Sequence, residues 1–118
     1  MTVQEKTEKL HQKVYDFLLY ICPLLAKYPK YEKFTLQKET RCTLLGVLSD
    51  IIKYRKTDTK SHLYSADVQL QTAKEYIRLA HDLKYSAMNS QHYGTSWTKL
   101  KEIGEELGDI IEQVKSSK

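Results

Sequence analysis

The sequence has few of the residues that form turns. Only 4 glycines and 2 prolines occur among its 118 residues, whereas β-sandwiches and β-barrels need many turn residues between short strands. No segment alternates apolar and polar residues in the manner of a half-buried strand. These absences exclude the all-β classes and favour a small number of long helices.

Cysteine and long apolar runs are also scarce. Cys22 and Cys42 do not make a disulfide framework, and we interpret both as small core residues. No apolar run approaches the roughly 18 residues that cross a bilayer. The charged N-terminal stretch has no apolar segment of signal-peptide type. We therefore expect a cytoplasmic protein with no membrane partner.

The chain does contain 41% hydrophobic residues, too many for a disordered chain, and it has a net charge of +4. This charge is unevenly distributed. Residues 27–60 hold nine Lys or Arg and four Asp or Glu, a local net charge of +5, whereas residues 99–118 have a net charge of −1. The asymmetry predicts either a binding surface or a contact between subunits.

Apolar residues recur in steps of three and four along most of the chain, which is the spacing of one helix face. This spacing predicts helices over about residues 4–27 and 35–56, a third that ends near Tyr85, and a fourth that includes residues 100–114. Helices joined by short connections predict an all-α fold, an antiparallel up-down-up-down four-helix bundle. We expect one such domain over residues 1–118.

Three residues interrupt these helical patterns. Pro23 removes a backbone donor within the first helix and is expected to kink it or break it locally. Gly104 and Gly108 each weaken the fourth helix by about 1 kcal/mol relative to alanine, which predicts a flat strip where another helix approaches. The candidate caps of the third and fourth helices are Asp58 or Thr59 and Ser90 or Thr95.

The common catalytic and nucleotide-binding motifs, such as HExxH, GxGxxG and GxSxG, do not occur in the sequence. No histidine has a second histidine three or four residues away, so a metal site would need ligands from several helices. We predict no metal and no cofactor. Carboxylates share one face of the fourth helix, as a solvated face or as a contact for a basic face of another protomer. These carboxylates are Glu102, Glu105, Asp109 and Glu112.

Arg55 and His62 raise the possibility of a ribonuclease. An Arg followed closely by a His occurs in a family of helical-bundle ribonucleases, in which both side chains act on the RNA 2′-OH and phosphate. In this sequence the two residues flank the polar turn KTDTKS instead of sharing one helix. Ribonuclease activity is therefore the last of three hypotheses, and its test is cleavage by a His62→Ala variant.

Two groups of basic residues lie in the segment with excess charge. Lys27, Lys30 and Lys33 alternate with aromatic residues, and a second group surrounds Tyr54 near the end of the second helix. Because that helix joins the two groups, we expect them at opposite ends of the bundle. Basic residues among aromatics are typical of nucleic-acid binding, but cations near a helix C-terminus also stabilise the helix dipole. The second group is Lys53, Arg55, Lys56 and Lys60.

Two stretches of the sequence resemble known families. The stretch KYPKYEKFTLQKETRCTLLGVLSDI resembles the 23S rRNA-intervening sequence proteins. HLYSADVQLQTAKEYIRLAHDL is similar to the accessory variability determinants (Avd-like proteins) of diversity-generating retroelements, and Lys74 and Arg78 fall on that family's basic pair. The residues that match the first family are Tyr28, Pro29, Lys30, Glu32, Phe34 and Arg41, and those that match the second are Leu63, Tyr64, Ala66, Asp67 and Leu70.

The resemblance implies a four-helix bundle that assembles into a barrel-like homopentamer. It also implies a non-enzymatic protein that binds nucleic acid and a reverse transcriptase through basic surfaces. Our first hypothesis is therefore binding of RNA or DNA through phosphate contacts. The second is a purely structural assembly or protein-interaction module with no nucleic-acid role. The candidate nucleic-acid contacts are Lys74, Arg78, Lys27, Lys30, Lys33, Arg41, Arg55 and Lys56.

Overall fold

A computed structural model describes residues 1–116 of the chain. Four long helices form the fold, and no strand occurs in the part that the structure describes. The predicted all-α fold is therefore confirmed. The helices are α1 (Val3–Leu25), α2 (Leu36–Thr57), α3 (Ser61–Asp82) and α4 (Ser90–Ser116), with the short 3-10 helices η1 (Lys30–Glu32) and η2 (Ser86–Met88) in two connections.

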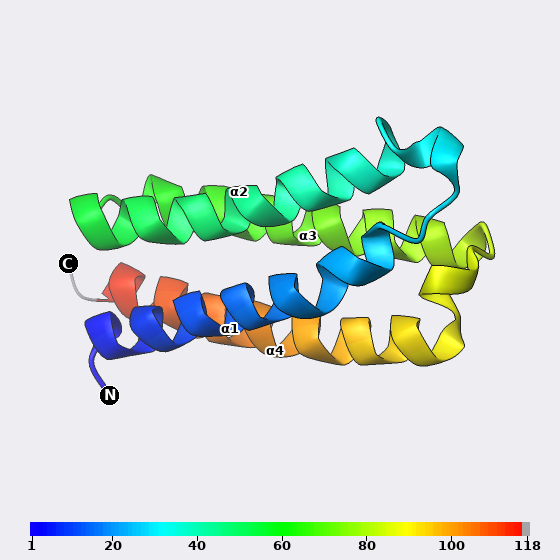
Figure 1. Ribbon diagram of the computed structural model, residues 1–118. Coiled ribbons are helices and arrows are strands. Elements are labelled where there is room, and N and C mark those ends of the chain that lie inside the picture. The colour runs from blue at the N-terminus through cyan, green and yellow to red at the C-terminus, as the bar shows by residue number, and fades with distance from the viewer. Residues whose placement is uncertain (117–118) are drawn as a thin grey trace.

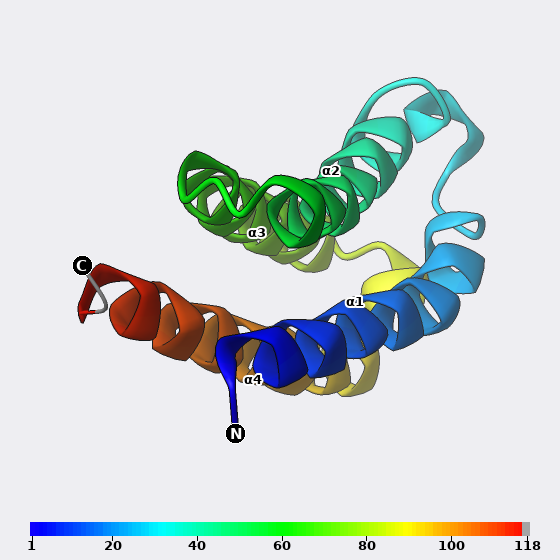
Figure 2. The same ribbon diagram turned by 90° about the vertical axis from the view of Figure 1, so that its left-hand side faces the viewer.

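The helices run alternately up and down, as the short connections predict. Figure 1 shows the α2–α3 turn at the same end of the bundle as both termini. The α1–α2 and α3–α4 connections lie at the opposite end, which we call the loop end. Figure 2 shows two layers, with α2 and α3 in one and α1 and α4 in the other. The bundle is 47 Å long and 25 by 19 Å across.

The core lies between the two layers and follows the predicted apolar spacing. Six residues of α3 that recur in steps of three and four are buried, and so are five residues of α4 with the same spacing. On α3 large and small residues alternate, so that α2 and α4 approach this helix closely. The α3 seam is Leu63, Ala66, Leu70, Ala73, Ile77 and Ala80, and the α4 seam is Leu100, Ile103, Leu107, Ile110 and Val114.

Several expectations about single positions are wrong. Cys42 is exposed instead of lying in the core. Leu45 and Ile52, which the apolar spacing of the second helix places on its buried face, are 47% and 39% exposed. Pro23 does not break α1, which continues to Leu25, and the expected kink stays a prediction. The side chain of Pro23 is exposed, and the backbone donor that it lacks falls within the last turn of the helix.

The expected caps also differ from the observed ones. Asp58 does not cap α3: it ends α2 in the left-handed conformation, with φ of 58°, and donates its backbone N–H to the Tyr54 carbonyl. Asp is among the few non-glycine residues that adopt this conformation. At the start of α4 the side chain of Asn89 accepts the backbone N–H of His92 at 2.9 Å, a role that neither Ser90 nor Thr95 fills.

The two glycines of α4 have different surroundings. A Cβ on Gly104 would lie 3.4 Å from Lys74 Nζ and 3.7 Å from Leu70 Cδ2, so the neighbour of Gly104 is α3 of the same chain. A Cβ on Gly108 would meet no atom within 4 Å. Only Gly104 therefore lies where a helix of this chain approaches.

The apolar residues of the helices lie partly in the core and partly on the surface. Within residues 1–116, no helix is both long enough and apolar enough to span a membrane.

Candidate nucleic-acid interface

The eight candidate residues do not form one surface. Lys27, Lys30 and Lys33 lie at the loop end, whereas Arg55 and Lys56 lie at the end that holds both termini. The two basic groups therefore lie at opposite ends of the bundle, as expected. Lys74 and Arg78 lie on α3 between these ends. Arg41, half-buried, lies in the first half of α2.

The loop-end segment, residues 30–35, contains backbone hydrogen bonds of the 3-10 type, which determine where its side chains lie. Backbone N–H groups of Glu32, Lys33 and Thr35 each donate to the carbonyl three residues earlier. In this geometry residues i and i+3 lie above each other. Lys30 and Lys33, joined by one of these bonds, therefore form one row, and we call Tyr31 and Phe34, three residues apart in the same segment, the second row.

In the same segment Glu32 is half-buried, whereas Thr35 is exposed. Glu32 accepts the Thr35 hydroxyl and, at 3.2 Å, the backbone N–H of Leu36, the first residue of α2. It also accepts the Tyr85 hydroxyl at 2.6 Å. The hydrogen bonds from Thr35 and Tyr85 hold the pKa of Glu32 below its usual 4.5, against the opposing effect of burial.

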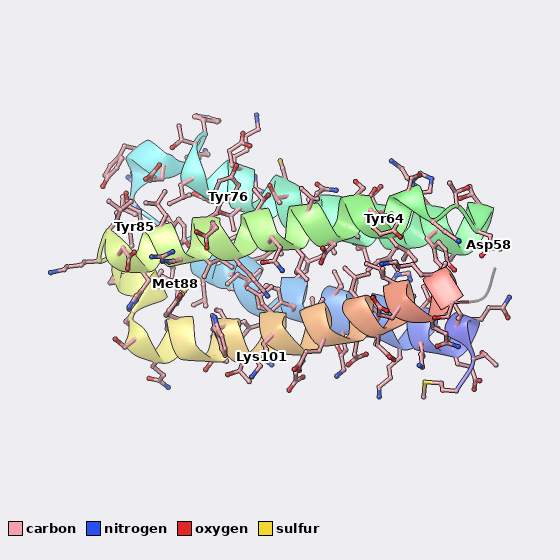
Figure 3. All side chains as sticks on the ribbon, turned by 180° about the vertical axis from the view of Figure 1, so that it is seen from behind. Asp58, Tyr64, Tyr76, Tyr85, Met88 and Lys101 are labelled. Carbon is pink, nitrogen blue, oxygen red and sulfur yellow. The ribbon has the colours of Figure 1, made fainter. Side chains whose placement is uncertain are left out.

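Tyr85 joins the loop-end segment to the end of α3. Its hydroxyl also accepts the Tyr31 hydroxyl at 3.2 Å, and its ring centroid lies 5.7 Å from that of Tyr28 and 6.3 Å from that of Tyr31. The hydrogen bond to Glu32 is the main cause that raises the pKa of Tyr85 above its usual range. Lys84, with φ of 64°, precedes Tyr85 at this end. Figure 3 shows Tyr85 and Met88 at the loop end, far from Asp58 and Tyr64.

Sequence reasoning missed Lys84 and Tyr85. The up-down topology could have identified them, because in such a bundle α3 ends at the same end of the molecule as α1. The missed pair adds a cation and an aromatic ring to the group predicted from Lys27, Lys30 and Lys33.

At the opposite end, Arg55 contacts a residue that sequence reasoning did not pair with it. Arg55 Nη1 lies 2.7 Å from Nδ1 of His11 on α1. Because the guanidinium only donates, His11 Nδ1 accepts and this ring is the Nε2-protonated tautomer. No hydrogen bond joins Arg55 to His62 within residues 1–116. The geometry therefore does not assemble the nuclease pair.

Lys74 and Arg78 share the side of α3 that faces α4, but their charges are compensated differently. The Lys74 ammonium lies over Gly104, and the structure gives it no carboxylate partner in the described chain. Arg78 lies 3.4 Å from Glu75 and 3.8 Å from Asp82. On this face Lys74 is thus the more available cation.

The acidic face of α4 is largely paired within the chain. Lys6 on α1 lies 2.8 Å from Asp109, and Lys13 contacts Glu106 and, at 3.6 Å, Glu102. The hydrogen bond to Glu106 is the main cause that raises the pKa of Lys13. Two of the predicted surface carboxylates therefore hold α4 against α1.

Possible metal ligands do not gather in the described part of the chain. No group of three or more His, Cys, Asp or Glu could hold a metal ion there. The main polar arrangements are the Glu32 hydrogen bonds, the Arg55–His11 contact and the α1–α4 ion pairs.

A family model described as bAvd-like matches residues 8–114, which is nearly the whole bundle. The chain belongs to the bAvd-like family. This is a family of accessory, non-catalytic proteins, and the match agrees with the Avd-like resemblance of the α3 sequence. No curated protein matches this bAvd-like chain.

Proposed function

We propose that this bAvd-like chain is a non-enzymatic accessory protein that binds RNA or DNA through basic surfaces. The observation that carries the proposal is the loop end, where exposed lysines lie beside exposed aromatic rings. None of these lysines has an ion-pair partner in residues 1–116. Free cations of this kind attract phosphate by counterion release. The lysines are Lys27, Lys30, Lys33 and Lys84.

Family membership supports the accessory part of the proposal. We further propose that the chain acts together with a reverse transcriptase in the cytoplasm. In such a role the protein positions the nucleic acid and the enzyme performs the chemistry. Pull-down of a reverse transcriptase encoded beside this chain, with and without ribonuclease treatment, tests the partnership.

A salt titration tests nucleic-acid binding. We expect the logarithm of the affinity for RNA or DNA to fall linearly with the logarithm of the salt concentration, by about 0.7 to 0.9 for each phosphate that is neutralised. Replacement of Lys30 and Lys33 by glutamine is expected to reduce that slope by about 1 to 2. Undetectable binding at low salt, or binding without a salt slope, contradicts the proposal.

We also propose that the protein is a homo-oligomer, and a homopentamer by its resemblance to Avd-like proteins. The support comes from apolar side chains that remain exposed along α1 and α2. Tyr15 and Leu19 on α1 are 48% and 62% exposed, and Leu45 and Ile52 on α2 are 47% and 39% exposed. Exposed apolar surface of this kind is typical of a protein contact. We call these four residues the α1/α2 apolar face.

The same face favours one alternative, a purely structural assembly module with no nucleic-acid role. In that case the protein assembles, and RNA has no effect on it. The α1–α4 ion pairs speak against the version in which an acidic α4 face meets a basic face of a neighbour. An oligomer that ignores RNA and DNA at low salt favours this alternative over the first.

A further inference from the structure

The loop end carries two side chains whose exposure is unusual for their type. Tyr31 is 73% exposed and Phe34 is 76% exposed. They lie three residues apart in the loop-end segment, and the hydrogen bond to Tyr85 together with an edge-on ring contact fixes Tyr31. Burial of such rings against a partner is favourable, because each removes a large apolar area from water.

The surroundings of these rings select an anionic partner. The neighbouring row is Lys30 and Lys33, and the Lys33 ammonium lies 5.5 Å from the centroid of the Phe34 ring. Glu32 is the one carboxylate of this segment, and its oxygens accept the Thr35, Tyr85 and Leu36 groups. Cations and exposed rings thus share one surface, and the carboxylate of the segment is engaged in hydrogen bonds within the chain.

We propose that the Tyr31/Phe34 row is a stacking platform for unpaired bases, so that the loop end binds single-stranded nucleic acid in preference to a duplex. The inference rests on the proposed nucleic-acid function and names its ligand class. Bases in a duplex are stacked on each other and offer only their edges in the grooves. A single strand offers its base faces to an aromatic ring while its phosphates reach the lysines.

The platform is rigid before the strand binds. Glu32 caps the first N–H of α2 and holds Tyr85, which in turn holds Tyr31. A ring that is already fixed loses little conformational freedom on binding. Stacking tolerates every base, so we expect little sequence preference.

Three labelled ligands separate base contacts from phosphate contacts in a fluorescence anisotropy titration of the full chain at low salt. They are an oligothymidylate of about 12 nucleotides, an abasic phosphodiester strand of the same length, and a duplex of the same length. The abasic strand has the same charge but no bases. We expect the oligothymidylate to bind about tenfold tighter than the abasic strand and tighter than the duplex.

Variants then assign the base contacts to the platform. Phe34→Ala and Tyr31→Ala are each expected to weaken oligothymidylate binding by about fivefold or more while leaving abasic-strand binding unchanged. Tyr31→Phe keeps the ring but loses the hydroxyl bond to Tyr85, so it is expected to weaken oligothymidylate binding less than Tyr31→Ala does. Tyr64→Ala is the matched control, because Tyr64 is an exposed aromatic at the other end of α3 (Figure 3). Circular dichroism checks that each variant is folded.

The outcomes separate this inference from the proposed function. If both strands bind with a salt slope but the platform variants behave like Tyr64→Ala, nucleic-acid binding stands and the stacking platform is wrong. Equal affinity for duplex and single strand also overturns the platform. If no ligand binds at low salt, the proposed function fails and the platform fails with it.

Discussion

Gly46 on α2 shows how one missing side chain makes room for a hydrogen bond between helices. Gln69 on α3 fills the space beside Gly46, and its Nε2 donates to Asp50 at 2.6 Å. Asp50 is one of the few buried polar residues and is only 5% exposed. A Cβ on residue 46 would overlap the Gln69 amide. The glycine thus allows a buried carboxylate to be paired across the α2–α3 contact.

Gly46→Ala is expected to destabilise the protein by about 1 kcal/mol. Displacement of Gln69 leaves Asp50 unpaired, at a cost of about 1 to 3 kcal/mol, whereas alanine restores about 1 kcal/mol of helix propensity. Gly108→Ala is the control, because no atom lies within 4 Å of its added Cβ. We expect that variant to be about 0.5 to 1 kcal/mol more stable. Urea unfolding measures the stability of both variants. A Gly46→Ala variant that is more stable than the wild type would contradict this role of Gln69.

Glu32 makes stability depend on pH in the acid range. Its folded pKa lies below the usual 4.5, because the Thr35, Tyr85 and Leu36 groups donate to the ionised carboxylate. The stability that it contributes is therefore complete above about pH 4.5 and is lost as the pH falls through the folded pKa.

We expect Glu32→Gln to lose less stability than the wild type between about pH 7 and about pH 3. The free energy of unfolding in urea, measured at both pH values, gives the comparison. Glu105→Gln is the control, since Glu105 is exposed and its side chain has no hydrogen bond or ion pair in the described structure. Equal acid sensitivity of wild type and Glu32→Gln would show that the hydrogen bonds do not favour the ionised carboxylate.

At the scale of the element, apolar spacing predicted the four helices because each buries one stripe against its neighbours. The α3 seam from Leu63 to Ala80 is buried throughout. Spacing could not predict which flanking residues stay exposed, such as Ile52, since that depends on the angle at which the next helix packs. It also could not predict that Glu32 and Tyr85, far apart in sequence, would meet at the loop end.

The α1–α4 contact depends on ion pairs as well as on its apolar seam. Lys13 lies between Glu102 and Glu106, with a third of its side chain exposed. Lys13→Met is expected to lower stability by less than about 1 kcal/mol, because partly exposed pairs are weakly stabilising. The difference should shrink at about 0.5 M salt, where screening is strong. Urea unfolding at two salt concentrations measures this difference in stability. Lys9→Met is the control, because Lys9 is exposed and unpaired in the described chain. If salt leaves the loss of stability in Lys13→Met unchanged, the loss comes from packing and not from the ion pairs.

At the scale of the whole molecule, the α1/α2 apolar face and the loop end are separate surfaces. The contact between His11 and Arg55 sets the register of the two antiparallel helices. Tyr15 lies one turn after His11 on α1, and Ile52 lies one turn before Arg55 on α2. Because the helices are antiparallel, Tyr15 and Ile52 lie side by side. The face lies within the middle stretches of α1 and α2, whereas the cations and aromatic rings of the loop end lie in and around the two connections at the tip of the bundle.

This separation predicts that assembly and nucleic-acid binding can be altered independently. A charge buried in an apolar contact is unfavourable by several kcal/mol, so Leu45→Glu is expected to give a monomer at concentrations where the wild type is assembled. Leu79→Glu, on α3 and similarly exposed, is the control and should remain assembled. Sedimentation velocity measures the mass, and circular dichroism confirms the helices. Because the loop end is intact in the Leu45→Glu monomer, each chain should retain single-strand affinity within about threefold. An assembled Leu45→Glu variant beside a monomeric Leu79→Glu variant would move the subunit contact from α1 and α2 to α3.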